Sequence, residues 1–389
     1  MKDNNISEAI RYVGVDDKDL DLFESQYKVP NGVSYNSYVI LDDKITVMDG
    51  VDDRGEDEWL ANIEKLLEGK KPDYLVVLHF EPDHSGGIEK FLVKYPETTV
   101  VGNAKTFSVG SNFVELDKYP QHLVKEGDEL CLGKHTLKFM MAPMVHWPEV
   151  MLAFEETEGV LFSADAFGKF GALEFEEDNW VDEARRYYIN IVGKYGAPVQ
   201  TVLKKAAALD IKKIAPLHGP VLSENLEKYI GLYDTWSSYK PEESGVLVAY
   251  ASIHGNTELV AKYVAKKLEE KGEKVVLTDL TRQDKSQAVA DAFRFDRMVL
   301  AASSYDGGVF IPMEDFLVDL SYKTYQNRKV ALIENGSWGP TAGRKMKGHI
   351  EGFKNVEIIG DMVTIKSRAK DADYANVDAL VEAVVAAKN

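Results

Sequence analysis

Cysteine is almost absent from this chain, because Cys131 is the only one among 389 residues. A single cysteine cannot form an internal disulfide, and it cannot supply the several thiolates that an iron-sulfur cluster or an all-cysteine iron centre requires. The sequence also has no apolar run of about 20 residues and no recognisable secretory leader. We therefore expect a cytoplasmic protein that receives any electrons it needs from elsewhere.

Positive charge is also in short supply. Lysine and arginine number 46 against 64 aspartates and glutamates, which gives a formal net charge of −18. Nucleic acid and anionic lipid surfaces would repel such a chain, so we expect neither as a partner. The length exceeds what one hydrophobic core usually organises, and it predicts two domains.

Two patterns of apolar residues divide the chain. From about Ser34 to Gly219, short apolar runs typical of strands are mixed with segments typical of helices, which predicts a layered α/β domain. The expected strands include 37–41, 44–48 and 151–154, and the expected helices are 58–68, 183–195 and 198–208. A polar, serine-rich stretch at 233–244 predicts the joint to a second domain.

Beyond this joint, strands and helices alternate regularly. The expected strands are 246–250, 274–277, 297–302, 329–333 and 356–359, and the expected helices are 258–271, 313–320 and 375–387. Such alternation predicts a doubly wound parallel sheet, which binds ligands beyond the carboxyl ends of its strands. We expect domains at 1–240 and 245–389.

Seven side chains of the kinds that bind metals occur where strands are expected to end. Four of them lie in the hexapeptide 79–84, directly after the apolar run 74–78. Four ionisable groups in six residues beside a buried strand would suffer severe repulsion and desolvation unless a cation compensated them. The full set is His79, Glu81, Asp83, His84, His146, Asp165 and His218.

The proportion of carboxylates indicates which metals this set favours. Three carboxylates beside four histidines make the set harder than an all-histidine zinc site, and they favour iron or manganese as well as zinc. Asp165 is the natural bridge, because a shared carboxylate offsets the repulsion between two cations. Taken singly, His146 and His218 also fit hydrogen-bonded structural histidines, and Asp165 fits a turn or helix cap. The complete set predicts a two-metal pocket.

The motif His79-Phe80-Glu81-Pro82-Asp83-His84-Ser85-Gly86-Gly87 resembles the metallo-β-lactamase signature in its flavo-diiron variant, in which glutamate stands where the hydrolases carry a histidine. The downstream segments 145–148, 163–165 and 216–220 match the remaining ligand positions of that family. The resemblance implies an N-terminal metallo-β-lactamase-like αββα sandwich that holds two iron ions per subunit.

The resemblance also implies a role for each ligand. The iron nearer a flavin would be bound by His79, Glu81 and His146, the distal iron by Asp83, His84 and His218, and both by Asp165. Tyr195 resembles a residue that lies just behind the ligands in this family; alternatively, it is a helix-end aromatic side chain packed on the core. Trp147 would line the path to the flavin, or it simply packs.

A polar loop follows the first expected strand of the second domain. Its small hydroxyl side chains, a glycine and the unpaired N–H groups of the next helix predict a receptor for a phosphate monoester. The alternative is a polar turn in which Thr257 caps the helix. The loop consists of Ser252, Ile253, His254, Gly255, Asn256 and Thr257.

Two later loops offer flat aromatic faces, Tyr305 and Trp338, at the same edge of the expected sheet. With the loop at 252–257 they resemble the phosphate loop and the two isoalloxazine-flanking loops of flavodoxin, which implies an FMN site; alternatively, the aromatic side chains only cover the sheet ends. The middle loop lacks the Ser/Gly-Pro-Thr sequence of many flavodoxin-like modules. The loop residues are Ser303, Ser304, Tyr305, Asp306, Gly307 and Gly308, then Asn335, Gly336, Ser337, Trp338 and Gly339.

Together these resemblances cover nearly the whole chain and imply a flavo-diiron protein without an appended third module. Such proteins reduce dioxygen to water or nitric oxide to nitrous oxide, and the missing cysteines call for rubredoxin or a similar small electron carrier. The family also implies a head-to-tail homodimer, or a dimer of dimers, in which the FMN of one subunit lies beside the irons of the other.

Two other functions compete with this interpretation. A zinc hydrolase fused to an accessory flavodoxin domain would share the fold, but Glu81 speaks against it. A non-enzymatic electron carrier would leave the seven ligands unexplained. Between dioxygen and nitric oxide the sequence does not decide, because both are small, uncharged and able to bind ferrous iron.

Overall fold

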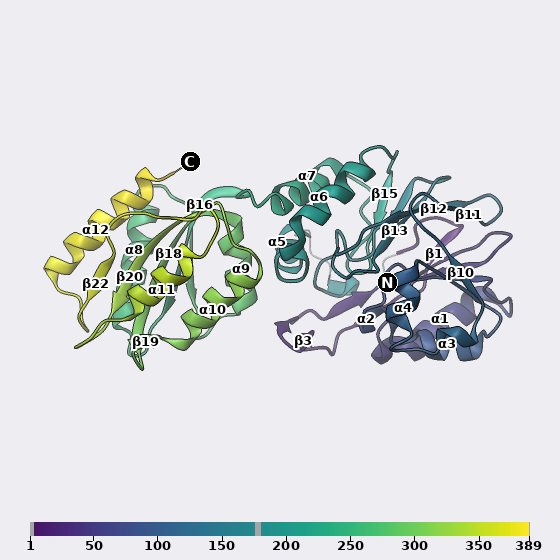
Figure 1. The fold of residues 1–389 in the computed structure, drawn as a ribbon, viewed down its shortest axis with the longest axis horizontal. Coiled ribbons are helices and arrows are strands. Elements are labelled where there is room, and N and C mark those ends of the chain that lie inside the picture. The colour runs from purple at the N-terminus through teal and green to yellow at the C-terminus, as the bar shows by residue number, and fades with distance from the viewer. Residues whose placement is uncertain (1–3, 176–179, 389) are drawn as a thin grey trace. The chain divides into compact units, whose positions relative to one another are not determined.

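The computed structural model describes residues 4–175 and 180–388 (Figure 1). The chain divides into two compact units, Met1–Tyr188 with Ala197–Asp234 and Ile189–Gly196 with Thr235–Asn389. The segment Ile189–Gly196, which interrupts the first unit in sequence, therefore packs with the second.

Two sheets form the centre of the first unit. The six-stranded sheet has the order β1 (Ile10–Tyr12), β6 (Tyr38–Ile40), β7 (Thr46–Met48), β8 (Tyr74–Val76), β9 (Thr99–Gly102) and β10 (Gln121–Leu123). The five-stranded sheet has the order β11 (Glu129–Cys131), β12 (Thr136–Met141), β13 (Met151–Glu155), β14 (Val160–Phe162) and β15 (Lys213–Ala215). Two short pairs are β2 (Val15–Asp17) with β5 (Val33–Tyr35) and β3 (Leu22–Phe23) with β4 (Tyr27–Lys28).

Helices cover the first unit on two sides. Figure 1 shows α1 and α3 at the lower right of this unit and α6 and α7 at its upper left, beside β15. The helices are α1 (Glu56–Leu67), α2 (Pro82–Ser85), α3 (Ile88–Lys94), α4 (Ala104–Gly110), α5 (Trp180–Tyr187), α6 (Gly196–Ala206) and α7 (Leu226–Ser237). This arrangement confirms the layered α/β sandwich that the sequence predicted.

The structure adds detail to two segments that the sequence singled out. The α-helix expected at 183–195 is α-helical only through Tyr187, and it continues as a π-helix at Tyr188–Val192 and a 3-10 helix at Gly193–Tyr195. The π-helical part contains Ile189, Ile191 and Val192 and is followed by Gly193, and β-branched residues and glycine are weak helix formers. The joint expected at 233–244 includes the point where the first unit ends, after Asp234, and part of it is regular structure, since α7 runs to Ser237 and the next strand starts at Glu243. Tyr233 and Trp236, three residues apart, are buried on one face of that helix.

The second unit is a parallel sheet in the order β17 (Val275–Asp279), β16 (Glu243–Ala251), β18 (Phe295–Tyr305), β20 (Lys329–Asn335) and β21 (Glu357–Ile358). In chain order this is 2-1-3-4-5, the flavodoxin-like arrangement. Strand β22 (Val363–Ile365) also pairs with β20, and β19 (Gly308–Val309) pairs with the end of β18. Residues 245–251 of β16 are all buried, as expected for a central strand covered on both faces.

Helices cover both faces of this sheet (Figure 1). The main hydrophobic core lies between the sheet and two helices, α8 (Asn256–Glu270) and α12 (Asp371–Ala386). The remaining helices are α9 (Lys285–Arg294), α10 (Ile311–Tyr322) and α11 (Ala342–Glu351). The doubly wound fold is thus confirmed. Helix α9 was not predicted, because its buried face is largely alanine and its apolar periodicity is weak.

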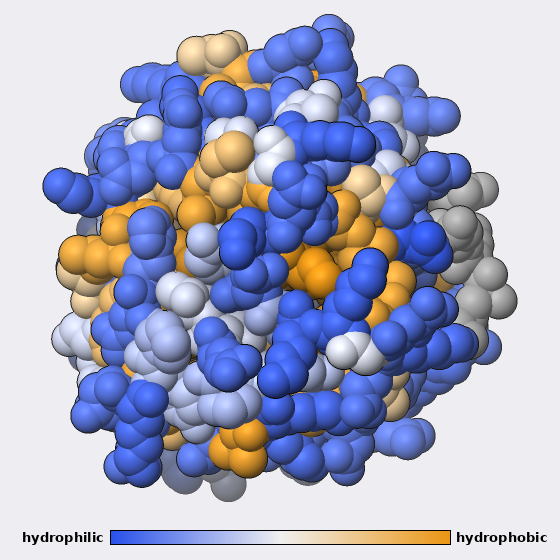
Figure 2. All heavy atoms as spheres, turned by 90° about the vertical axis from the view of Figure 1, so that its right-hand side faces the viewer, coloured by the Kyte–Doolittle hydropathy of each residue, from blue (hydrophilic) through white to orange (hydrophobic). Residues whose placement is uncertain are grey.

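The surface of the first unit is less uniformly polar than the net charge suggests. Figure 2 shows a face on which hydrophobic side chains form an irregular band among hydrophilic ones. A shallow hollow of about 390 Å³ on this unit has a largely apolar lining that includes Leu123, Met141 and Pro143. Among the described helices, none combines the length and the apolar character needed to cross a membrane.

Candidate metal centre and flavin site

The loop that carries four of the candidate ligands is held by a buried carboxylate. Asp49 follows strand β7 and accepts hydrogen bonds from the backbone N–H groups of Leu78, at 2.7 Å, and His79, at 3.3 Å. Burial raises the pKa of Asp49 to about 7, although these two N–H groups act in the opposite direction. Pro82 then starts the short helix α2, which carries Asp83 and His84. The end of β8 and the start of α2 thus determine where the loop points.

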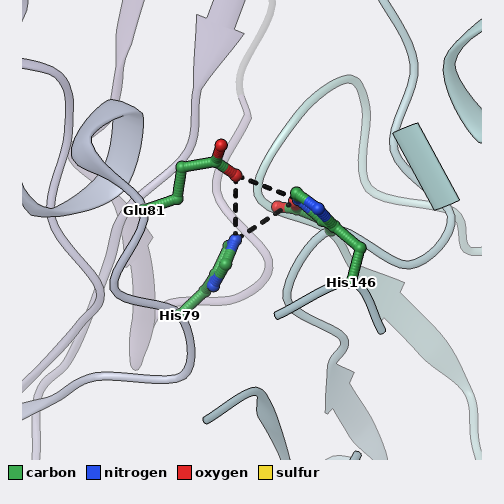
Figure 3. A group of neighbouring side chains, drawn as sticks. His79, Glu81 and His146 are labelled. Atoms are coloured by element: carbon green, nitrogen blue, oxygen red, sulfur yellow. Dashed lines mark hydrogen bonds and ion pairs between the residues drawn. The ribbon is translucent and has the colours of Figure 1, made fainter. Parts of the chain in front are cut away.

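Four of the seven residues form one group, and Figure 3 shows three of them, His79, Glu81 and His146, pointing toward one another. Glu81 Oε2 lies 3.2 Å from His79 Nε2 and 2.9 Å from His146 Nε2. Asp165 Oδ2 completes the group at 3.0 Å from His146 Nε2 and 3.6 Å from His79 Nε2. Four ligand atoms from three separate segments therefore converge on one point.

The other three residues form a second group beside the first. Asp83 Oδ2 lies 3.3 Å from His84 Nε2 and 3.2 Å from His218 Nε2. The second oxygen of Asp165, Oδ1, lies 3.1 Å from His84 Nε2 and 4.0 Å from His218 Nε2. Asp165 thus directs one oxygen at each group, which is the geometry of a bridging ligand.

The second group carries buried polar atoms that lie close to one another but, within the described residues, make no hydrogen bond of acceptable geometry. Such atoms are rare in proteins, because leaving one unsatisfied costs about 1–3 kcal/mol. A cation placed between Asp83, His84 Nε2, Asp165 Oδ1 and His218 Nε2 would bind the atoms that face it, and a mixture of carboxylates and imidazoles fits iron, manganese or zinc. The atoms are both carboxylate oxygens of Asp83, both ring nitrogens of His84, Oδ1 of Asp165 and Nε2 of His218.

The carboxylates and imidazoles of the first group shift one another's pKa values. Burial alone would raise the pKa of Glu81, but His146 and His79 lower it to about 2. Burial alone would lower the pKa of His146, but the carboxylates of Asp165 and Glu81 raise it to about 9. The pKa of Asp165 is likewise lowered, because His79 and the other histidines outweigh burial. A metal that binds here displaces protons from the histidines, so its affinity falls as the pH falls.

Aromatic side chains pack around this centre. The ring centre of His218 lies 5.5 Å from that of Phe23, 5.4 Å from that of Tyr187 and 6.0 Å from that of Tyr35. The Tyr187 hydroxyl is buried without a hydrogen-bond partner. Trp147 meets His79 edge to face at 5.5 Å. The walls of the site are therefore largely aromatic.

Tyr195 is the residue that the sequence suggested as a neighbour of the ligands. It ends the 3-10 helix Gly193–Tyr195, in the segment that packs with the second unit. No contact found among the described residues joins its side chain to any of the seven candidate ligands. Tyr187 lies beside the candidate ligand His218, with ring centres 5.4 Å apart. The sequence offers several tyrosines in one helical stretch, and only packing distinguishes them.

The expected phosphate loop leads from β16 into α8. Gly255 stands at the N-terminus of α8 with a φ of 82°, and no side chain caps this end of the helix. The alternative in which Thr257 is the cap is wrong, because its hydroxyl is 2.9 Å from that of Ser303. The Ser252 hydroxyl is buried and has no hydrogen-bond partner. Ile253 and His254 are exposed, and Asn256 begins the helix. Free N–H groups and an unpartnered hydroxyl suit a phosphate.

The middle loop is mostly strand. Strand β18 runs to Tyr305, and Asp306 and Gly307, with φ values of 48° and 71°, make a two-residue turn into β19, which starts at Gly308. The Ser304 hydroxyl accepts hydrogen bonds from the backbone N–H groups of Thr341, at 2.8 Å, and Ala342, at 3.0 Å. Ser304 therefore braces helix α11 and joins the middle loop to the third loop.

The third loop is braced by Ser367, which the sequence did not suggest. Asn335 donates to the backbone oxygen of Ser367 and accepts from its N–H, at 2.8 and 3.0 Å, and the Ser337 hydroxyl meets the Ser367 hydroxyl at 2.6 Å. Beyond this brace, Gly336 and Gly339 flank Trp338, whose side chain is 97% exposed. Tyr305 is 47% exposed. Both aromatic side chains are therefore accessible to solvent.

Comparison with known proteins matches both units. A family model described as ODP family beta lactamase matches residues 33–219, and a flavodoxin model matches residues 248–376. An uncharacterised protein of Methanocaldococcus jannaschii is 29% identical over 374 residues, which are 94% of each chain. The anaerobic nitric oxide reductase flavorubredoxin of Vibrio vulnificus is 28% identical over 349 residues, 86% of this chain and 70% of that one.

Solved structures share the whole fold. The rubredoxin oxygen:oxidoreductase of Desulfovibrio gigas superposes with a TM-score of 0.91 at 24% identity and covers 98% of both chains. The flavodiiron protein of Giardia intestinalis reaches a TM-score of 0.89 at 23% identity, over 99% of this chain and 96% of that one. Both units and their order along the chain are therefore shared with these proteins.

Proposed function

We propose that this chain, a flavo-diiron oxidoreductase with a beta-lactamase-like domain followed by a flavodoxin domain, reduces dioxygen, nitric oxide or both with electrons that arrive through FMN. The observation that carries this proposal is the position of Asp165, whose two oxygens face two separate groups of ligand atoms. A carboxylate so placed holds two cations together.

The seven side chains would hold one iron in each group. His79, Glu81, His146 and Asp165 would bind the first, and Asp83, His84, His218 and Asp165 the second. Bound there, iron would supply Lewis acidity and electrons to a small molecule, as FMN in the second unit would supply stored electron pairs. Glu81 supports iron over the zinc of a hydrolase, because it adds a third carboxylate to the set.

The aromatic walls support a small, uncharged substrate. Phe23, Tyr35 and Tyr187 pack around His218, so the second group lies in an apolar surrounding that favours a gas over an anion. The names of the relatives include both a nitric oxide reductase and an oxygen oxidoreductase. The choice between the two gases is left to experiment.

FMN would bind where the three loops of the second unit meet. Its phosphate would lie at the uncapped N-terminus of α8 near Ser252 and Gly255, and its ring beside Tyr305 and Trp338. Because Trp338 is almost fully exposed, an electron-donating partner would have access to the flavin ring beside it. We propose rubredoxin or a similar small carrier as the donor. We also propose a head-to-tail homodimer in which one subunit's FMN serves the other subunit's irons.

Metal and flavin analysis followed by gas consumption tests this function. The purified full chain should contain two irons and one FMN per subunit, and the anaerobically reduced protein should consume dioxygen or nitric oxide when mixed with each gas separately. Water or nitrous oxide as product identifies the substrate. Zinc at full stoichiometry without iron would favour the hydrolase, and gas consumption at background would leave only an electron carrier.

A further inference from the structure

His79 is held from behind by a carboxylate that the sequence did not single out. Its Nε2 faces the first ligand group, and its Nδ1 lies 2.8 Å from Oε1 of Glu149, with both side chains 0% exposed. For Nε2 to offer its lone pair to a cation, the ring must carry its proton on Nδ1. Nδ1–H then donates to Glu149, which fixes both the tautomer and the orientation of the ring.

Glu149 is itself fixed by its surroundings. Its Oε1 also accepts a hydrogen bond from the backbone N–H of Phe80 at 3.0 Å, so it holds the ligand loop and the ligand ring at once. Asn103 donates its side-chain amide to the backbone oxygen of Glu149 at 2.6 Å. Asn103 in turn caps helix α4, because its Oδ1 accepts from the N–H groups of Lys105 and Thr106. The carboxylate is therefore anchored to regular structure.

The other histidines are supported differently. His218 Nδ1 lies 2.7 Å from the backbone oxygen of Ser34, a neutral acceptor. His84 Nδ1, the nitrogen that faces away from the ligands, has no hydrogen-bond partner among the described residues. Among the contacts of the described residues, His79 is the histidine of the two groups whose outward nitrogen meets a carboxylate. An anion behind a metal-binding imidazole makes the ring a stronger electron donor, which a carbonyl does to a smaller degree.

We propose that Glu149 is a positioning residue for one of the two ligand groups. The cation affinity of the first group depends on Glu149, and the cation affinity of the second group does not. The first group consists of His79, Glu81, His146 and Asp165. The inference rests on the proposed function in one respect, because it takes both groups to be metal sites. The inference adds a difference between the two groups in what their cation affinity depends on. The ligands alone do not produce this difference, because each group contains two histidines and both share Asp165.

Two substitutions separate the charge of Glu149 from its hydrogen bonds. In Glu149→Gln, the amide oxygen still accepts from His79 and Phe80 while the negative charge is lost, and the new NH2 group takes the place of Oε2, which has no partner. In Glu149→Ala, both are lost. The matched control is Glu155→Gln, because Glu155 is also 0% exposed and accepts two backbone N–H groups, at 2.8 and 2.7 Å, from Thr157 and Glu158.

The readout is metal binding and does not require activity. Metal-depleted full-length protein is titrated with Co²⁺, followed by visible absorption and calorimetry, and the wild type should show two binding steps. We expect Glu149→Ala to weaken one step by about 10- to 100-fold and Glu149→Gln to weaken the same step by a smaller factor. The other step should not move, and Glu155→Gln should leave both unchanged.

Two further variants assign the affected step. Glu81→Ala should weaken the step that depends on Glu149, and His84→Ala should weaken the other. Thermal melts of the metal-free proteins should coincide for Glu149→Gln and wild type, so that a folding defect does not mimic the effect. If Glu149→Ala does not fold, Glu149→Gln decides.

Three outcomes would overturn the inference. Equal weakening of both steps would make Glu149 a general structural residue, and wild-type affinity at both steps in Glu149→Gln would make its charge irrelevant. The same loss in Glu155→Gln would show that any buried glutamate has this effect. A wild type that takes up no Co²⁺ would instead remove the metal sites, and with them the proposed function.

Discussion

At the scale of single residues, Asp165 concentrates the most chemistry. Its Oδ2 faces the first group of ligand atoms and its Oδ1 faces the second. Its side chain is almost completely buried. Asparagine has the same shape, but it offers only one oxygen. Its NH2 group does not bind a cation. The two groups therefore cannot both keep their shared ligand after Asp165→Asn.

We accordingly expect Asp165→Asn to retain at most one iron per subunit and to lose gas consumption. Elemental analysis of the purified protein measures the first effect and a gas electrode the second. The control is Asp42→Asn, because the Asp42 side chain is 4% exposed and accepts N–H groups from Lys134 and His135 away from both ligand groups. Full iron content in Asp165→Asn would contradict the bridging role.

Asp17 and Arg54 form an ion pair of a structural kind. Burial alone would raise the pKa of Asp17, but the hydrogen bonds and charge of Arg54 lower it. A carboxyl whose pKa is lower in the folded state stabilises the fold above its unfolded pKa of about 3.9 and loses that effect as pH falls through the folded pKa. Asp17→Asn removes the carboxyl.

We expect Asp17→Asn to lower the free energy of unfolding by about 1 kcal/mol at neutral pH. The difference from wild type should shrink as the pH is lowered below about 4, because the wild-type carboxyl then becomes protonated. Urea denaturation at several pH values measures this, with the exposed Asp43→Asn as control. A difference that stays constant with pH would argue against the ion pair as its source.

At the scale of elements, the hairpin of β3 and β4 covers the second ligand group. It turns at Glu24 and Ser25, which both have positive φ, at 48° and 56°. Phe23, the last residue of β3, is 4% exposed and meets the rings of Phe170 and His218 at 5.5 Å each. One aromatic side chain thus attaches a short hairpin to His218 of the second ligand group.

Removing that side chain should loosen the hairpin. We expect Phe23→Ala to lower the free energy of unfolding by about 3 kcal/mol, because a buried phenyl ring leaves a cavity. Phe113→Ala, at a side chain that is 48% exposed, should cost much less. Urea denaturation compares the two. Equal losses would mean that Phe23 is not a core contact.

A matched pair of glycines flanks helix α8 (Asn256–Glu270). Gly255 at its start and Gly272 just after its end have φ values of 82° and 80°, and an added Cβ would clash with nothing at either. Alanine at either position should therefore cost about 1 kcal/mol from backbone strain alone. Only Gly255 lies at the proposed phosphate site.

We expect Gly255→Ala to weaken FMN binding by about tenfold, which corresponds to about 1.4 kcal/mol. Gly272→Ala should bind FMN like the wild type while losing similar stability. Quenching of FMN fluorescence on addition to flavin-free protein measures the affinity. Equal affinities for the two variants would move the phosphate away from the start of α8.

At the scale of the whole molecule, the chain passes between its two units more than once. Asn190, from the segment that interrupts the first unit, donates to the backbone oxygen of Ser286 at 3.1 Å. The Tyr239 hydroxyl donates to the backbone oxygen of Lys194 at 3.1 Å, and Arg328 donates to that of Tyr239 at 2.7 Å. The second unit is thus completed by residues from the middle of the sequence.

Mixed dimers test whether electrons pass between subunits. Asp165→Ala removes the metal centre, and Ser252→Glu places a carboxylate where the FMN phosphate would bind. Each variant alone should be inactive. In a head-to-tail dimer, coexpression of both should restore about a quarter of wild-type activity, because half of the dimers are mixed and each mixed dimer has one working pair of sites. Background activity in the coexpressed sample would place both sites within one chain.

The sequence by itself determined the fold class, the order of the two units and the residues that compose both ligand groups, because apolar periodicity and ligand chemistry are local properties of short segments. It did not determine the π-helical turn after α5, in which tertiary contacts outweigh helix propensity. Only the tertiary structure decided that Tyr187 lies beside His218, and that each oxygen of Asp165 faces a different group. It alone brought Glu149 to His79 across 70 residues. Such contacts depend on how distant segments pack, which no local pattern encodes.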